Sequence, residues 1–145
     1  MSKSNAFENL VLLNFFNNST IPNIGDATGL RGSATAGVLY LSAHTADPGE
    51  AGDQTTNECT YGSYARVSVV RSGAGFVVTG NSVSPAADTL FPEATSGSQT
   101  ITHIGIGVAS SGAGLLLYSG TATPNVAVVT GVAPKVKTTS TVTED

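Results

Sequence analysis

The sequence is poor in charged and aromatic residues, and it has no tryptophan and a single cysteine. Asp, Glu, Lys and Arg fill 11% of the 145 positions, against about 25% in an average globular protein. Because Cys59 has no second cysteine to pair with, the chain cannot form an internal disulfide. The first residues do not resemble a secretory leader, so we expect the chain to fold in a cytoplasm.

Positive charge is scarce and scattered along the chain. Six Lys and Arg stand against ten Asp and Glu, which gives a net charge of −4. A nucleic-acid surface needs grouped cations that displace phosphate counterions, so the composition excludes nucleic acid as a partner. No apolar run approaches the length of about 18 residues that crosses a bilayer, so we expect no membrane partner.

Small polar residues fill the gap that the missing charges leave. Thr, Ser and Gly together occupy 52 of the 145 positions, a composition typical of strands joined by tight turns. No internal repeat is visible, which excludes a solenoid or a propeller. The sequence predicts one mainly β domain over residues 1–145, an antiparallel β-sandwich or open, jelly-roll-like barrel with one short N-terminal helix.

The helix is predicted over residues 5–16. Asn5 is a suitable N-cap, and Glu8 three positions later completes a capping box. Phe7, Leu10 and Val11 recur at helical spacing and predict the face by which the helix docks. Residues 17–37 have turn chemistry and little periodicity, so we expect a long connecting arm.

The β core is predicted over residues 38–132. Its expected strands are 38–43, 64–70, 75–79, 100–109, 115–121 and 126–132, with the second and third forming a hairpin. Residues 44–62 and 80–99 are expected to be loops. Residues 133–145 form a C-terminal arm with no obvious partner within the chain; its β-prone members are Lys135, Val136, Lys137 and Val142. Such a segment gains order by adding to a sheet edge of its own subunit or of a neighbour.

Two glycines share one face of the predicted strand 100–109. Gly105 and Gly107 point the same way, because side chains alternate along a strand. Glycine weakens a strand, so two on one face predict that something bulky packs closely against them. The N-terminal helix and a neighbouring subunit are the two candidates.

No set of residues completes a catalytic, metal or cofactor site. His44 and Asp47 lie three positions apart, but no nucleophile motif accompanies them, and Asp47 begins a turn at Pro48. The carboxylates of this region lack the spacing of a calcium loop, and Cys59 and the two histidines lack the short pair that starts a zinc site. We therefore expect a protein that is not an enzyme and that binds neither a metal nor a cofactor.

The loop after residue 43 is the candidate partner-binding loop. Tyr61 and Tyr64, with His44 and Asp47, provide the aromatic and polar side chains that sugar sites commonly combine. The alternative is that Tyr64 packs within a sheet. Residues alone do not choose between the two.

Six segments occur in a recognisable order and spacing: Asn5–Asn9, Val38–Gly52, Tyr61–Val67, Leu90–Thr95, Ile101–Ile106 and Leu115–Gly120. Together they resemble a family of small tailed-bacteriophage virion proteins, described as tail fibre or head decoration proteins. The resemblance covers most of residues 5–123, except for 24–37, and implies a virion structural protein without enzymatic activity.

The chain has no repeat or coiled coil to build a fibre shaft. We therefore favour a capsid decoration (cement) protein on the head surface of the virion, assembled in the host cytoplasm. Its expected partners are the major capsid protein and copies of itself, in a homo-oligomer for which a trimer is expected. The alternative is a tail or tail-fibre component that acts as an adaptor or as a receptor- or carbohydrate-binding module.

Overall fold

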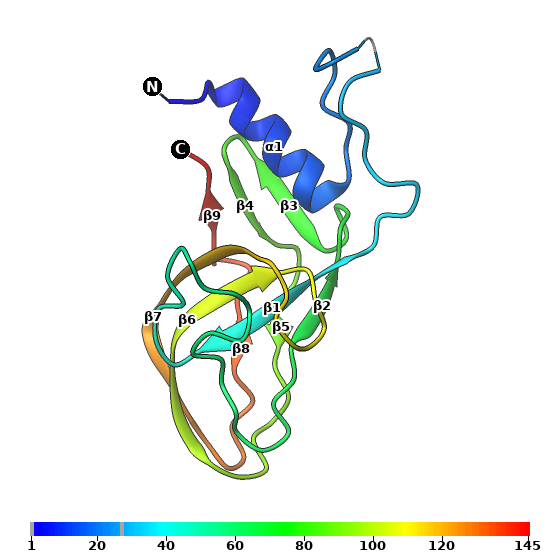
Figure 1. Ribbon diagram of the computed structural model, residues 1–145. Coiled ribbons are helices and arrows are strands. Elements are labelled where there is room, and N and C mark those ends of the chain that lie inside the picture. The colour runs from blue at the N-terminus through cyan, green and yellow to red at the C-terminus, as the bar shows by residue number, and fades with distance from the viewer. Residues whose placement is uncertain (1, 27) are drawn as a thin grey trace. The chain divides into compact units, whose positions relative to one another are not determined.

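The computed structural model describes residues 2–26 and 28–145 (Figure 1). It is 36% strand and 9% helix, and its sheets are antiparallel, so the predicted mainly β, sandwich-like class with one short N-terminal helix is confirmed. The chain forms two compact units: unit 1 comprises Met1–Val38, Val69–Asp88 and Lys137–Asp145, and unit 2 comprises Leu39–Ser68 and Thr89–Val136. That they make one domain stays a prediction. Within the described residues, no helix is long and apolar enough to cross a membrane.

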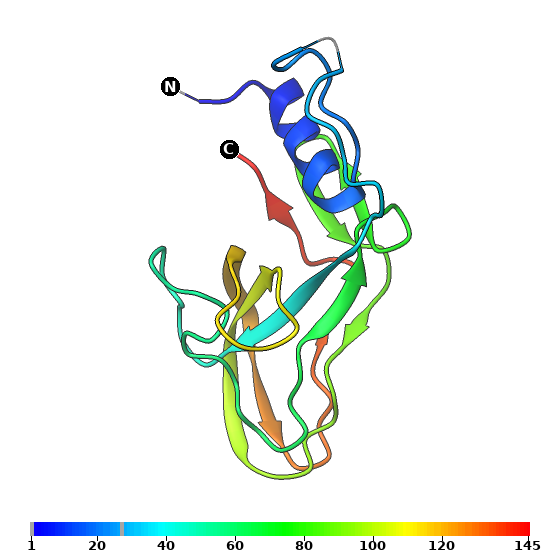
Figure 2. The same ribbon diagram turned by 45° about the vertical axis from the view of Figure 1, so that its right-hand side comes forward.

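Unit 1 is a helix on a small sheet. Helix α1 (Asn5–Asn17) packs against β3 (Phe76–Thr79) and β4 (Ser82–Pro85), and β9 (Val142–Thr143) completes a sheet of order β3-β4-β9 (Figure 1, Figure 2). The rings of Phe16 and Phe76 meet edge to face with centroids 5.0 Å apart. Such a contact stabilises a pair beyond its buried area, so it fixes the helix on its sheet.

The N-cap of α1 is Ser4, and the predicted Asn5 cap is wrong. The Ser4 side chain accepts a hydrogen bond from the Phe7 amide, which makes Asn5 the first helical residue. Glu8 is therefore one position too late for a capping box. At the other end Asn18 adopts a left-handed conformation (φ 55°) and closes the helix, as its turn chemistry indicates.

The buried face of α1 is not the one predicted. Glu8, Leu12 and Phe16 are buried, whereas Phe7 remains 37% exposed and Leu10 and Val11 are half-buried. The helix has apolar residues on nearly every side, so periodicity alone does not select a face. The sheet beneath it makes the choice.

The arm between α1 and β1 is fastened within unit 1. Ile21 and Leu30 form an antiparallel bridge, and Asn18 exchanges hydrogen bonds with Ser33. The Arg71 guanidinium donates to the carbonyls of Asn14, Phe15 and Ala36, so it joins the end of the helix to the end of the arm. Five Arg donors in a rigid fork suit several carbonyls at once.

Unit 2 is built around a four-stranded sheet of order β2-β1-β6-β7. Leu41 of β1 lies opposite Ile106 of β6, and β6 pairs along most of its length with β7. A second sheet joins β5 to β8. The strands of the two sheets are β1 (Val38–His44), β2 (Val67–Val70), β5 (Thr89–Leu90), β6 (Ser98–Gly107), β7 (Leu116–Val129) and β8 (Lys135–Val136). The first residue of β1 and the last two of β2 are counted in unit 1.

Two strand predictions are corrected. The expected hairpin of strands 64–70 and 75–79 is wrong, because β2 pairs with β1 while β3 pairs with β4, which the sequence predicted as loop. The expected strands 115–121 and 126–132 are one strand, β7. Ile101 pairs with Val126 but His103 with Thr121, so Pro124 lies in a bulge of an edge strand, where a missing amide donor is tolerated.

The C-terminal segment finds its partners within its own chain, which corrects the expectation of none. Val136 pairs with Thr89 in the β5–β8 sheet, and Val142 pairs with Val83 of β4. Val136 is buried, and Lys135 and Lys137 are exposed. The tail therefore adds short strands to existing sheet edges.

Candidate ligand-binding cleft in unit 2

A buried ion pair holds the long loop that follows β1. Arg66 Nε and Nη2 bond Glu58 Oε1 and Oε2 at 2.6 and 2.8 Å, and the Arg66 side chain is 2% exposed. The same guanidinium donates to the carbonyls of Ala109 and Gly112 at 3.0 and 2.8 Å. Arg66 thereby joins this loop to the connection between β6 and β7. Nothing in the spacing of Glu58 and Arg66 signals an ion pair, so the sequence did not predict this role of Arg66.

His44 is a structural residue and does not form a pair with Asp47. Its ring is fully buried, with Nε2 2.8 Å from Ser42 Oγ and Nδ1 2.8 Å from the Thr56 carbonyl. That carbonyl can only accept, so Nδ1 bears the proton and Nε2 accepts from Ser42. Burial lowers the pKa of His44. Ser42 and His44 resemble a nucleophile and its base, but both are 0% exposed and no substrate reaches them.

Tyr61 and Tyr64 face the interior of unit 2, so they do not form the exposed sugar platform considered from the sequence. Tyr61 is 3% exposed and donates to the Pro92 carbonyl. The Tyr64 hydroxyl donates to Glu58 Oε1 at 2.9 Å and accepts from the Ala43 amide, and burial raises its pKa. The alternative, that Tyr64 packs within a sheet, is not met either, because Tyr64 lies three residues before β2 begins at Val67.

The two glycines of β6 are buried against side chains of the same unit. A Cβ on Gly107 would stand 2.2 Å from Gln54 Cδ, and one on Gly105 would stand 2.6 Å from Ser42 Oγ. Gln54 accepts from the Ala109 amide through Oε1. The packing partners in unit 2 are thus Gln54 and Ser42, where the sequence suggested the helix or another subunit.

Two carboxylates of the loop after β1, those of Asp47 and Asp53, are each held in a local turn. Asp47 Oδ1 accepts from the Gly49 amide at 2.9 Å, and Asp53 Oδ1 accepts from the amide and hydroxyl of Thr55. Among residues 2–26 and 28–145, no three His, Cys, Asp or Glu side chains gather as metal ligands.

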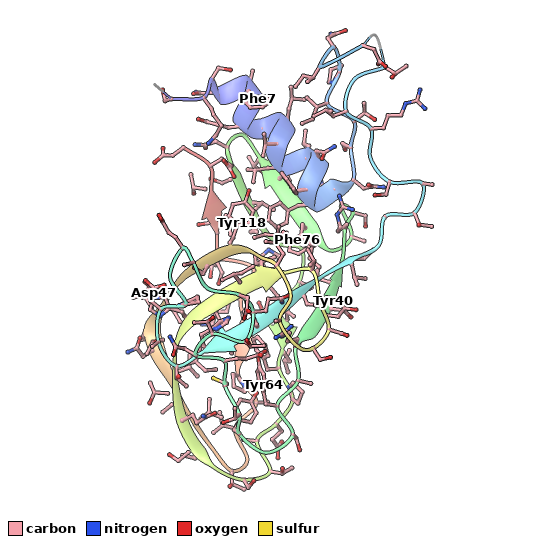
Figure 3. All side chains as sticks on the ribbon, viewed as in Figure 1. Phe7, Tyr40, Asp47, Tyr64, Phe76 and Tyr118 are labelled. Atoms are coloured by element: carbon pink, nitrogen blue, oxygen red, sulfur yellow. The ribbon has the colours of Figure 1, made fainter. Side chains whose placement is uncertain are left out.

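One open cleft lies beside the edge strand β7, with a volume of about 470 Å³. The turn after β1 provides Asp47, β6 provides His103, and β7 provides Tyr118; Asp47 and Tyr118 are labelled in Figure 3. His103 lies opposite Thr121 in the β6–β7 register. The lining residues are Asp47, Gly49, Glu50, Gly52, His103, Leu116, Leu117, Tyr118, Ser119, Gly120 and Thr121.

The cleft combines polar and acidic groups. Asp47 and Glu50 are exposed carboxylates of the lining, whereas Tyr118, opposite Ile106 in the register, lies on the other face of the sheet from His103 and Thr121. The lining contains no Lys or Arg. Of the four residues proposed for a partner-binding loop, the cleft includes only Asp47. His103 was missed, since only the fold brings this residue of β6 beside the distant turn that holds Asp47.

Comparison with known protein families decides the identity of the chain. The model of a family described as Podophage GP4 fiber I protein gp80 matches residues 4–144. The chain belongs to this family. No curated protein matches it.

Membership of the gp80 fibre family makes the chain a structural protein of the virion of a tailed phage. The family is one of structural fibre proteins, which agrees with the buried state of His44 and Ser42. The match also includes residues 24–37 and those beyond 123, so these segments belong to the family pattern that the sequence resemblance had not covered.

Proposed function

We propose that the chain is a structural component of a phage tail fibre. The observation that carries this proposal is the family match: the family is described as a fibre protein, and its model matches residues 4–144. This is the tail-fibre alternative that the sequence left open, and it replaces the favoured role in capsid decoration.

The two arms, residues 17–37 and 133–145, are engaged within the chain, which leaves them unsuited to clamp neighbouring capsid subunits. Arg71 holds the arm of residues 17–37 at both ends, and β8 and β9 pair the tail with β5 and β4. The Lys3 ammonium also lies 3.0 Å from the Glu144 carboxylate. A clamp needs segments that can leave their own subunit, so these contacts favour a fibre component over a cement protein.

Copies of the same chain are the proposed partners, through the outer side of α1. Phe7, Val11 and Phe15 follow one another at four-residue spacing, and Phe7 and Phe15 are 37% and 41% exposed. The stripe has no charged member, so two copies can meet on it without like-charge repulsion. A symmetric oligomer built on this stripe, for which three copies are expected, suits a fibre.

Fractionation of virions tests the proposal. Particles are disrupted into heads and tails, and peptides of this chain are quantified by mass spectrometry in each fraction against the major capsid protein and a tail protein. We expect the chain to follow the tails, in a few copies for each particle. A copy number comparable to the major capsid protein, in the head fraction, would restore the decoration proposal.

A further inference from the structure

We propose that the cleft beside β7 binds an extended peptide segment of another virion protein. The segment adds as a strand to the outer side of β7 and places Lys or Arg side chains against Asp47 and Glu50. The inference goes beyond the proposed place in a tail fibre, since it states the kind of partner that one surface of the chain fits.

The outer side of β7 is a long and uncharged sheet edge. β7 is last in the order β2-β1-β6-β7, and within residues 2–26 and 28–145 no strand pairs with its outer side (Figure 1). It has 14 residues, where strands usually have about five or six. Proteins commonly protect such an edge with charged side chains, but residues 94–134 include no Asp, Glu, Lys or Arg. The edge can therefore accept an added strand.

The cleft follows this edge. All six residues of the segment 116–121 line it, and because side chains alternate between the faces of a strand, a ligand that contacts all six runs along the backbone. The bulge at Pro124 lies outside this segment. Beyond its chain neighbours, a Cβ on Gly120 would meet no heavy atom of the described residues within 4 Å, so a second backbone can approach there.

The dimensions of the cleft suit an extended chain. The segment 116–121 spans about 17 Å of strand, so the volume of about 470 Å³ corresponds to a cross-section of about 28 Å². A helix is about 10–12 Å across with its side chains and needs more than twice that area. An extended backbone, which lies about 4.8 Å from its neighbour in a sheet, fits.

The charge beside the cleft selects a basic segment. Asp47 and Glu50 are exposed on the loop after β1, and Gln54 of the same loop packs on Gly107. Gly107 and His103 are an even number of positions apart along β6, so the loop covers the face that bears His103. Alternate side chains of an added strand reach this face and meet the two carboxylates, and the lining has no Lys or Arg to compete. Lys or Arg at alternate positions therefore complements the cleft.

A second copy of this chain does not supply such a segment. Its own β7 is uncharged and would leave the carboxylates of both clefts unpaired, and the chain as a whole has a net charge of −4. Arg66 is buried in its pair with Glu58, and Arg71 donates to three backbone carbonyls. Lys135 lies in β8, which is already paired with β5. These observations favour another protein as the occupant.

The acidic side of the cleft is held in place before binding. Asn57 Nδ2 donates to the Asp47 carbonyl at 2.9 Å, and the Gly49 amide donates to Asp47 Oδ1 at 2.9 Å. A carboxylate has about four acceptor sites, so Asp47 retains capacity for a cation of the partner. A site that is rigid before binding loses less entropy when the partner binds.

The test measures binding of synthetic peptides to the purified full-length protein by fluorescence anisotropy. One peptide has Lys at alternate positions of a Thr and Val framework, and a second has Glu at the same positions. Two further versions of the Lys peptide have alternate backbone amides methylated, each in one of the two possible phases. We expect the Lys peptide to bind at least tenfold more tightly than the Glu peptide, with an affinity that falls as salt is added.

The methylated peptides identify strand addition. Only one phase of amides in an added strand faces β7. Methylation in that phase should therefore raise Kd at least tenfold, and methylation in the other phase should leave Kd unchanged.

Variants assign the binding to the cleft. Asp47→Asn with Glu50→Gln should remove the preference for the Lys peptide over the Glu peptide, and Ser119→Lys should raise the Kd of the Lys peptide at least tenfold. Asp26→Asn with Glu93→Gln is the matched control, because it removes the same charge at two exposed positions outside the cleft. Thermal melts verify that each variant is folded.

Three peptide results would overturn the inference: no binding of the Lys peptide, equal binding of the Lys and Glu peptides, or an unchanged Kd in both methylated versions. Self-association of the protein alone that Ser119→Lys abolishes would also overturn it, because a second copy would then occupy the edge. None of these results bears on the fibre proposal, which depends on where the chain lies in the particle.

Discussion

Replacing Arg66 by Ala tests whether the ion pair with Glu58 holds unit 2 together. The change removes two hydrogen bonds to the Glu58 carboxylate and two to the carbonyls of Ala109 and Gly112. Breaking a buried pair costs about 3–5 kcal/mol, because the remaining charge has lost its partner. A chain of this size shifts its melting temperature by about 2–4 °C per kcal/mol, so we expect a fall of about 6–20 °C.

The assay is urea unfolding of the purified protein, followed by circular dichroism, with a calorimetric melt as a second measure. Arg31→Ala is the matched control: Arg31 is exposed, and surface changes usually stay within about 0.5 kcal/mol. The double variant Arg66→Met with Glu58→Gln should recover part of the loss, since no unpaired charge remains. A loss below about 1 kcal/mol in Arg66→Ala would refute the reasoning, because the guanidinium would then contribute no more than a surface pair.

Three further changes test the buried positions. Burial lowers the pKa of His44 in the folded protein, whereas the unfolded chain keeps an ordinary value of about 6.5. As the pH drops below about 6.5 the unfolded state takes up the proton first, so the free energy of unfolding should fall. The difference between unfolding midpoints measured at pH 7.5 and at pH 5.5 should be smaller in His44→Gln than in the unchanged protein. Gly107→Val should cost about 1–3 kcal/mol by overpacking against Gln54, and a denaturation midpoint equal to that of the unchanged protein would remove the close-packing argument. Leu12→Ala should cost about 2–5 kcal/mol, and Phe7→Ala less than half as much in the monomer; the reverse order in urea unfolding would contradict the burial of Leu12.

The sequence was most informative where one signal dominates locally. The helix ends within one residue of its predicted end, because Asn18 closes it in a left-handed conformation and the turn-rich arm begins there. The strands beginning at Val38 and near Thr100 were predicted because their apolar alternation is long enough to outweigh single exceptions. Local pattern was sufficient for these elements.

Pairing between distant segments was beyond the sequence. The turn after β2 has hairpin chemistry, yet β2 pairs with β1 and β3 with β4, since Gly80 and Asn81 make the tighter turn. The tail was assigned no partner because two-residue strands such as β8 and β9 have no detectable periodicity. Such strands form only where an edge is available.

Of the four residues predicted for the partner-binding loop, one lines the cleft. Asp47 lines the cleft, but the polarity of His44 and Tyr64 suggested exposure when internal hydrogen bonds satisfy them. Burial of a polar residue depends on partners such as Thr56 and Glu58, which the spacing does not identify. The same limit hid His103, which lines the cleft beside residues of β7 and of the turn after β1.

The central claim, that the chain belongs to a tail fibre, is tested most directly by a cryo-electron microscopy reconstruction of the intact particle focused on the tail. The fold of unit 2, with its long β6–β7 ladder, is distinctive enough to be recognised in a map that resolves strands. We predict density for this chain in the fibres of the tail and none on the head shell. Density for it across the head shell, beside the major capsid protein, would contradict the account.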